Sequence, residues 1–155
     1  MKYQCTLLAV RDMERSRRFY ETVLGLCVTA DFGANVTMSD CVALQSLESW
    51  RVLLHKPEEG TVFGGNDAEL YFEEDDFDGF CAGLAGMEID YVHPPVEHRW
   101  GQRAVRFYDP DRHVIEVGEN INSVVRRYSA QGLSDREVAA RMDVPLEFVE
   151  QALQT

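Results

Sequence analysis

The stretch WGQRAVRFYDPDRHVIEVG, residues 100–118, contains two short runs of β-branched and aromatic residues on either side of a turn at 109–112. Pro110 presets φ at the second position of a tight turn, and the Asp109 side chain can cap the turn backbone. The stretch therefore predicts a β-hairpin. Strand side chains alternate, so Glu116 points from a face that otherwise carries apolar residues. Burying such a carboxylate is costly unless it is paired or used, so Glu116 is either an exposed position or a functional group.

The segments before and including this hairpin show the same order of predicted elements twice. Each copy begins with a strand, continues with a helix that an aspartate caps and a glycine ends, and closes with three strands. Asp12 caps the first helix, and Asp75 or Asp76 caps the second, so that Asp76 stands 64 residues after Asp12. This repeat predicts two βαβββ modules, about 1–56 and 67–119, that bury a shared face and are joined by the glycine-rich linker 56–66. In the first module we expect a helix that ends at Gly25 and strands at 3–10, 26–31, 36–44 and 50–55. In the second we expect a helix that ends at Gly86 and strands at 68–73, 87–93, 103–108 and 113–118.

Length and composition indicate one globular domain with an appendage. The 155 residues have 45% hydrophobic and 27% charged content and a net charge of −12, which argues against a nucleic-acid or anionic-membrane partner. Cys5, Cys27, Cys41 and Cys81 form no C-x-x-C pair, so neither a zinc knuckle nor a disulfide framework is indicated. The chain shows no signal-peptide core and no membrane-spanning run, so we expect a cytoplasmic protein with reduced thiols.

Residues 120–155 depart from the repeat and predict a C-terminal helical extension. One helix is expected from about 122 to 131, a second after the capping box Ser134–Glu137, and a third with Pro145 in its first turn. Their spacing is typical of a helix-turn-helix. However, the third helix, PLEFVEQALQ, has no Lys or Arg to contact phosphate or guanine, so a packing or interaction appendage is favoured over DNA binding.

Several short stretches together carry a family resemblance across residues 3–118. They are VRD at 10–12, RS at 15–16, FY at 19–20, LGL at 24–26, DDFD at 75–78, WG at 100–101, and F-x-DPD-x-x-x-IE from 107 to 116. In order and spacing these stretches resemble the vicinal-oxygen-chelate superfamily, which includes glyoxalase I, bleomycin-resistance proteins and extradiol dioxygenases. The resemblance implies an α+β fold in which two βαβββ modules form a U-shaped mixed sheet around a small-molecule cleft, often in a homodimer. It covers a domain at 1–119 and leaves 120–155 outside.

The resemblance also implies positions for a divalent metal ion such as Zn, Ni, Mn or Fe. The carried-over positions hold Cys5, Glu69 and Glu116, with Leu53 at the fourth and His55 one step outward on the same face. This set offers no nitrogen at the four positions, which disfavours the ferrous site of a dioxygenase. A thiolate with two carboxylates could bind zinc, whereas two carboxylates without a metal would raise one another's pKa and leave one as a base. The metal-free alternative is favoured.

Other residues are expected to bind a ligand in the cleft. Tyr71 shares a face with Glu69, and Arg99 and Trp100 lie on the loop that borders the opening in relatives. An aromatic wall with one cationic group suits a planar or anionic small molecule. His93 and His98 flank that loop and are interpreted as solvated.

Three hypotheses follow. The first is a glyoxalase-like lyase or isomerase in which Glu116 or Glu69 abstracts a proton next to a carbonyl. The second is a metal-free binding protein of the resistance type, and the third is a regulatory module that acts through the C-terminal helices.

Overall fold

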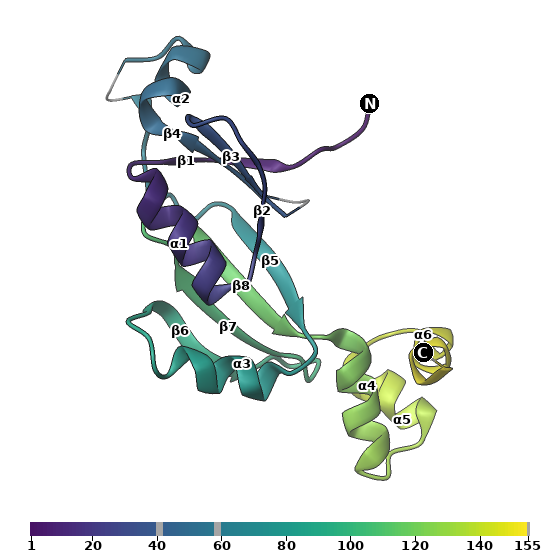
Figure 1. The fold of residues 1–155 in the computed structure, drawn as a ribbon. Helices are drawn as coiled ribbons and strands as arrows, with labels where there is room; N and C mark the ends of the chain where they lie inside the picture. The colour runs from purple at the N-terminus through teal and green to yellow at the C-terminus, as the bar shows by residue number, and fades with distance from the viewer. Residues whose placement is uncertain (40–41, 58–59, 155) are drawn as a thin grey trace. The chain divides into compact units, whose positions relative to one another are not determined.

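The computed structural model describes residues 1–39, 42–57 and 60–154 (Figure 1). Cys41 and part of the expected linker at 56–66 lie outside these ranges. The chain divides into two compact units. Unit 1 comprises Met1–Ala68 with Asp109–His113, and unit 2 comprises Glu69–Tyr108 with Val114–Thr155. No helix among the described residues is both long and apolar enough to cross a membrane.

The two units contain sheets of the same topology. The first sheet has the strand order β1-β4-β3-β2 and the second β5-β8-β7-β6, and in each the first pair is parallel and the others antiparallel. The duplicated βαβββ module and the α+β class are thereby confirmed. Unit 1 contains β1 (Thr6–Val10), α1 (Met13–Val23), β2 (Val28–Asp31), β3 (Asn35–Met38), β4 (Val42–Ser46) and α2 (Leu47–Leu54). Unit 2 contains β5 (Glu69–Glu74), α3 (Phe77–Leu84), β6 (Asp90–Glu97), β7 (Arg103–Tyr108), β8 (Val114–Glu119), α4 (Ile121–Ala130), α5 (Asp135–Met142) and α6 (Leu146–Gln154).

Local signals place the two module helices as expected. Asp12 accepts a hydrogen bond from the backbone N–H of Arg15 at 3.0 Å, and Asp76 accepts one from Gly79 at 3.0 Å. Each side chain satisfies a backbone donor that the first helical turn leaves free. Gly25 follows α1 with φ +65°, a left-handed conformation that glycine adopts without a steric penalty.

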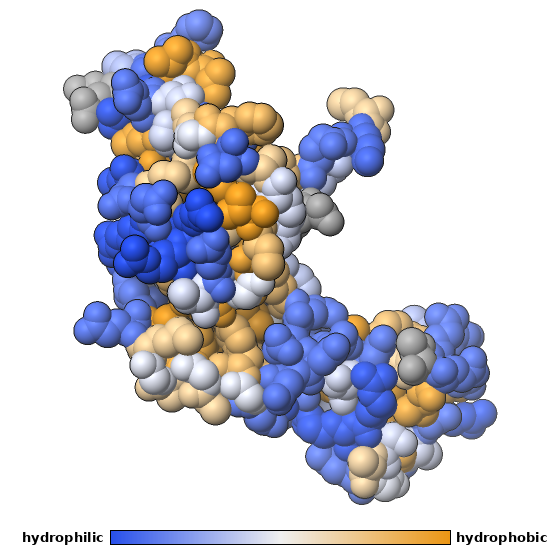
Figure 2. Space-filling model, viewed as in Figure 1, coloured by the Kyte–Doolittle hydropathy of each residue, from blue (hydrophilic) through white to orange (hydrophobic). Residues whose placement is uncertain are grey.

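The fourth strand expected in the first module, 50–55, is wrong because residues 50–54 belong to α2 and His55 caps it. Ser46 caps this helix by accepting from the N–H of Ser49, and His55 ends it in a left-handed conformation. The expected strand 36–44 is instead two strands, β3 and β4. Val52, Leu53 and Leu54 are exposed, and Figure 2 shows apolar surface at α2. A short apolar run suits a strand or a helix equally, and here the serine cap selects the helix.

This correction changes which residue of unit 1 corresponds to Glu116. Tyr71 pairs with Glu116 between β5 and β8, and Leu7 pairs with Ala43 between β1 and β4 in the same parallel arrangement. Ala43, which is buried, therefore occupies the last-strand position of the first module. The alignment that placed Leu53 there is wrong.

The turn between β7 and β8 belongs to unit 1 and is built around Asp109, whose side chain is fully buried. Its Oδ1 accepts hydrogen bonds from the backbone N–H groups of Asp111 at 2.9 Å and His113 at 2.8 Å. Its Oδ2 accepts from the Tyr20 hydroxyl of α1 at 2.9 Å. The predicted hairpin and the cap by Asp109 are confirmed. Burial raises the pKa of Tyr20 well above its ordinary value, and the Asp109 carboxylate adds to the rise.

Helices α4–α6 of unit 2 enclose an apolar cluster of their own. The capping box Ser134–Glu137 is present, and α5 ends at Asp143 in a left-handed conformation. Leu153 of α6 is 38% exposed, whereas Ala152 is buried. The buried members of the cluster are Val124, Val125, Tyr128, Val138, Ala139, Met142, Val149 and Ala152.

Candidate functional site

The sheet of unit 2 has one apolar and one polar face. Phe80 of α3 contacts the apolar face, where its ring lies 6.5 Å from that of Phe107. The opposite face carries four side chains that lie side by side across the strands, which we call the polar row: Tyr71 (β5), Glu116 (β8), Arg106 (β7) and His93 (β6). Because neighbours in register project from the same face, these groups can act together.

Arg106 is the centre of the polar row. Its Nε donates to Glu69 Oε2 at 2.9 Å, and its Nη2 contacts Glu116 Oε2. The Glu116 side chain is 7% exposed, so the guanidinium compensates a buried carboxylate. The two glutamates predicted as catalytic groups are therefore brought together, but through a shared cation.

His93 accepts from this guanidinium, which determines its tautomer. Arg106 Nη1 lies 3.2 Å from His93 Nε2, and because an arginine can only donate, Nε2 must be unprotonated. His93 Nδ1 lies 2.8 Å from the carbonyl oxygen of Pro94, which can only accept. Imidazole with its proton on Nδ1 satisfies both contacts, so both ring nitrogens of His93 are engaged in the row.

Tyr71 and Trp100 are connected through the amide of Gln102. Gln102 Nε2 donates to the Tyr71 hydroxyl at 2.9 Å, and Gln102 Oε1 accepts from the indole Nε1 of Trp100 at 3.1 Å. The Tyr71 hydroxyl in turn donates to Glu73 at 2.8 Å. Burial raises the pKa of Tyr71, the bond from Gln102 lowers it, and the Glu73 carboxylate raises it further. Tyr71 is 49% exposed and Trp100 37% exposed, so both rings remain accessible.

His98 and Gly118 complete the surroundings of these aromatic groups. The His98 ring stacks on Trp100 with centroids 4.4 Å apart. Burial lowers the pKa of His98, and the positive charge of Arg106 lowers it further. A Cβ at Gly118 would lie 3.0 Å from Gln102 Nε2 and 3.2 Å from the Tyr71 ring, so glycine permits this close packing.

The remaining predicted site residues lie elsewhere. Arg99 is exposed and pairs with Asp143 at 3.2 Å, so its charge is directed at the C-terminal helices. Cys5 precedes β1 in unit 1 and is partly buried. Leu53 is 60% exposed on α2, and His55 ends that helix.

Sequence reasoning missed Arg106 and Gln102. A signal for Arg106 was available, because counting outward from the turn pairs Tyr108 with Val114 and then Arg106 with Glu116. The hairpin register alone therefore places a cation opposite the buried carboxylate. Nothing comparable in the sequence indicates Gln102, whose role depends on the path of the loop before β7.

The donor set does not fit the divalent ion that the family resemblance implies. A metal would have to lie between the carboxylates of Glu69 and Glu116, and the Arg106 guanidinium already bridges these two groups. Within residues 1–39, 42–57 and 60–154, no three His, Cys, Asp or Glu side chains gather in a way that could hold a metal. The guanidinium supplies the positive charge that a metal would otherwise bring.

The comparisons with known proteins agree with the fold and the duplicated module. The model of the glyoxalase-like domain matches residues 3–122, and this chain belongs to that family. A protein of unknown function from Agrobacterium tumefaciens str. C58 is 35% identical and superposes with a TM-score of 0.70, covering 78% of this chain and 95% of its own. A lactoylglutathione lyase from Agrobacterium tumefaciens is 26% identical with a TM-score of 0.59, covering 77% and 93% of the two chains.

A more distant structure shows the fold alone. A glyoxalase/bleomycin resistance protein/dioxygenase from Nocardioides is 20% identical with a TM-score of 0.64, covering 77% of this chain and 83% of its own. No curated protein matches the sequence. The family match ends at 122, so most of α4 and all of α5 and α6 lie outside it.

Proposed function

We propose that this chain binds a small organic molecule over the polar row of unit 2, without a metal ion. The observation that carries the proposal is the pairing of Arg106 with both Glu69 and Glu116. A carboxylate engaged with a guanidinium is a poor metal ligand and a poor general base, but the ion-paired row offers fixed donors and acceptors to a bound molecule. This function matches the resistance-type members of the family.

The charges around the row favour a planar cation as the ligand. Glu69, Glu73 and Glu116 bring three carboxylates to this face, whereas Arg106, which pairs with Glu69 and Glu116, brings one positive charge. A cation can lie over the exposed ring of Tyr71 or Trp100, and the excess negative charge stabilises it. The anionic ligand considered from the sequence depended on Arg99, whose charge pairs with Asp143.

The first prediction is that proflavine, a planar cation, raises the Tm of the protein, whereas acridine-9-carboxylate, a planar anion, does not. Ligand present at about 100 times its Kd stabilises a protein by about 2.7 kcal/mol. Tyr71→Ala is expected to weaken proflavine binding about tenfold, because stacking on one aromatic ring contributes about 1–2 kcal/mol. Differential scanning fluorimetry and isothermal titration calorimetry measure the two effects.

Phe32→Ala is the matched control, since Phe32 is a 78% exposed aromatic residue of unit 1. It should leave proflavine binding unchanged. Equal stabilisation by the two acridines, or a proflavine response that disappears after dialysis against EDTA, would contradict the proposal.

A lyase or isomerase is the second candidate, favoured by the likeness to a lactoylglutathione lyase. The second prediction separates it from binding. Arg106→Ala should lower the free energy of unfolding by about 2 kcal/mol, because Glu116 loses its partner while Arg106 itself is one quarter exposed. The same variant should gain stabilisation by Mn²⁺ that the parent protein lacks, since two freed carboxylates suit that ion.

Arg126→Ala, on an exposed arginine of α4, controls for loss of charge. Stoichiometric metal in the purified parent protein, or an equal response of the parent protein to Mn²⁺, would instead favour the metal-dependent enzyme. Lactoylglutathione formation from methylglyoxal and glutathione assays that activity directly.

Three further expectations rest on the family resemblance and the sequence. We propose that the glyoxalase-like domain ends near residue 119 and that 120–155 is an appended segment, which the end of the family match at 122 supports. A homodimer and a cytoplasmic location stay predictions.

A further inference from the structure

We propose that helices α4–α6 position the loop at residues 99–102 and, through it, the aromatic rings of Trp100 and Tyr71, with Arg127 as the main positioning residue. The effect that this positioning has on ligand binding rests on the proposed function. The positioning itself can be measured without a ligand.

Helices α4 and α5 and the residue that ends α5 contact this loop through three side chains. Arg127 of α4 donates from Nη2 to the carbonyl oxygen of Gly101 at 2.6 Å, and Arg141 of α5 donates to that of Arg99. Asp143, which ends α5, accepts from the Arg99 guanidinium at 3.2 Å. Two of the four loop residues, Arg99 and Gly101, are therefore held by side chains of the C-terminal segment.

The loop also packs closely against Tyr128 of α4 at Gly101. Gly101 has φ +89°, and a Cβ at this position would overlap the Tyr128 hydroxyl. The Tyr128 hydroxyl donates to Glu97, just before the loop, at 3.3 Å. The loop backbone thus lies directly against a buried ring of the helical cluster, and only glycine allows this approach.

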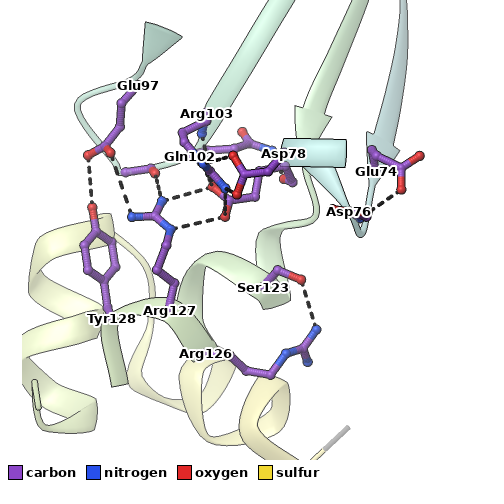
Figure 3. Close-up of polar contacts among 12 residues, drawn as sticks. Glu74, Asp76, Asp78, Glu97, Gln102, Arg103, Ser123, Arg126, Arg127 and Tyr128 are labelled. Carbon is purple, nitrogen blue, oxygen red and sulfur yellow. Dashed lines mark hydrogen bonds and ion pairs between the residues drawn. The ribbon is translucent and has the colours of Figure 1, made fainter. Parts of the chain in front are cut away.

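Arg127 is connected to Trp100 and Tyr71 through Glu119 and Gln102, and Figure 3 labels Arg127 and Gln102 of this path. Arg127 donates to the Glu119 carboxylate from Nε at 3.2 Å and from Nη2 at 3.0 Å. The backbone carbonyl oxygen of Glu119 accepts from Gln102 Nε2 at 2.9 Å. Arg127 therefore holds Gly101, which precedes Gln102, and Glu119, whose backbone accepts from Gln102.

All the hydrogen-bonding groups of the Gln102 side chain are in use, and the residue is only 6% exposed. Its amide nitrogen donates to Glu119 and to the Tyr71 hydroxyl, and its amide oxygen accepts from the Trp100 indole. Both donors and the acceptor are used in defined directions. A displacement of the loop must therefore break a bond to Trp100, Tyr71 or Glu119, so the helices and the aromatic rings are coupled.

The third prediction uses Trp100 as its own probe. Trp50 is the other of the two tryptophans, so Trp50→Phe leaves Trp100 as the single fluorophore. In that background, Arg127→Ala should shift the Trp100 indole N–H resonance, increase acrylamide quenching of its fluorescence about twofold, and weaken proflavine binding about tenfold. A tenfold weaker affinity corresponds to about 1.4 kcal/mol, and it is expected because a Trp100 ring that the loop no longer holds must be ordered when the ligand binds.

Two variants make the result specific. Arg126→Ala removes a neighbouring arginine of α4 that donates to Ser123, away from the loop (Figure 3), and should change none of the readouts. Arg127→Lys keeps the charge but cannot bridge Gly101 and Glu119 with one planar group, so partial rescue is expected. If Arg127→Ala fails to fold, Arg141→Ala tests the same coupling through the Arg99 carbonyl.

The outcomes separate this inference from the proposed function. An unchanged Trp100 resonance and unchanged quenching in a folded Arg127→Ala or Arg141→Ala protein would overturn the positioning role. A shifted resonance without any proflavine binding by the parent protein would support positioning and refute the proposed ligand class.

Discussion

Replacing Asp109 with alanine is expected to lower the free energy of unfolding of unit 1 by about 4 kcal/mol, the largest effect among our predictions. The Asp109 carboxylate is fully buried and accepts bonds from the backbone of Asp111 and His113, from the Tyr20 hydroxyl, and from the His113 ring at 2.8 Å. Alanine leaves the buried donors of Tyr20 and Asp111 and the partly buried donors of His113 without this acceptor, and each unsatisfied buried group costs about 1–3 kcal/mol.

Urea denaturation followed by the fluorescence of Trp50 measures this loss. Trp50 belongs to unit 1 and Trp100 to unit 2, so a Trp100→Phe background reports on unit 1 alone. Tyr20→Phe is the graded comparison, because it removes one donor and keeps the buried ring; about 1.5 kcal/mol is expected. A loss in Asp109→Ala no larger than that in Tyr20→Phe would show that the turn does not depend on this carboxylate.

The next largest effect is expected for Glu119→Gln, about 3 kcal/mol at neutral pH, in unit 2. Glu119 is buried and accepts from the guanidinium groups of Arg103 and Arg127, at 3.0 Å in each case (Figure 3). Glutamine has one acceptor oxygen and no charge, so two neighbouring guanidinium groups lose their shared counterion. Urea denaturation with Trp100 as the single fluorophore measures the loss.

The same carboxylate makes this stabilisation depend on pH. Burial by itself raises the pKa of Glu119, but the bonds from Arg103 and Arg127 outweigh it and hold the pKa below its ordinary value. A carboxylate with a lowered folded pKa contributes stability that is fully present above the unfolded pKa, about 4.3, and is lost as the pH falls through the folded pKa. The stability difference between the parent protein and Glu119→Gln should therefore be constant near neutrality and vanish in acid.

Other carboxylates lie near the two guanidinium groups that pair with Glu119, so the experiment needs a control variant. Asp78 pairs with Arg103 at 2.7 Å and Glu97 with Arg127 at 3.8 Å, so both guanidinium groups face further carboxylates. Glu74→Gln is the control, because Glu74 lies beside Glu119 in the sheet but accepts from the backbone of Asp76. A difference between the parent protein and Glu119→Gln that persists unchanged in acid would contradict the assigned role.

The elements that the sequence predicted well are those with local causes. Asp12 and Asp76 cap their helices through bonds within one turn, and Asp109 organises a turn through bonds to residues two and four positions away. The duplication followed from these caps and from the spacing between them. The strand predicted at 50–55 is wrong because its apolar pattern is too short to separate strand from helix, and the cap at Ser46 decided it.

The candidate site was predicted in part. Glu69 and Glu116 do come together, and Tyr71 and Trp100 are connected, yet the residues that connect them, Arg106 and Gln102, were not expected. Arg106 stands 37 residues from Glu69, and Gln102 stands 31 residues from Tyr71. The contacts with Glu69 and Tyr71 depend on the pairing of β5 with β8 and on the path of a loop, which no local pattern specifies, whereas the hairpin register alone places Arg106 opposite Glu116.

By itself the sequence determined the duplicated module, its helix caps, the hairpin turn and the helical character of the C-terminal segment, because each depends on bonds between residues a few positions apart. The tertiary structure decided that a guanidinium lies between the two carboxylates and that the C-terminal helices hold the loop carrying Trp100. These arrangements arise from burial, since a carboxylate removed from water must find a partner wherever the folded chain brings one.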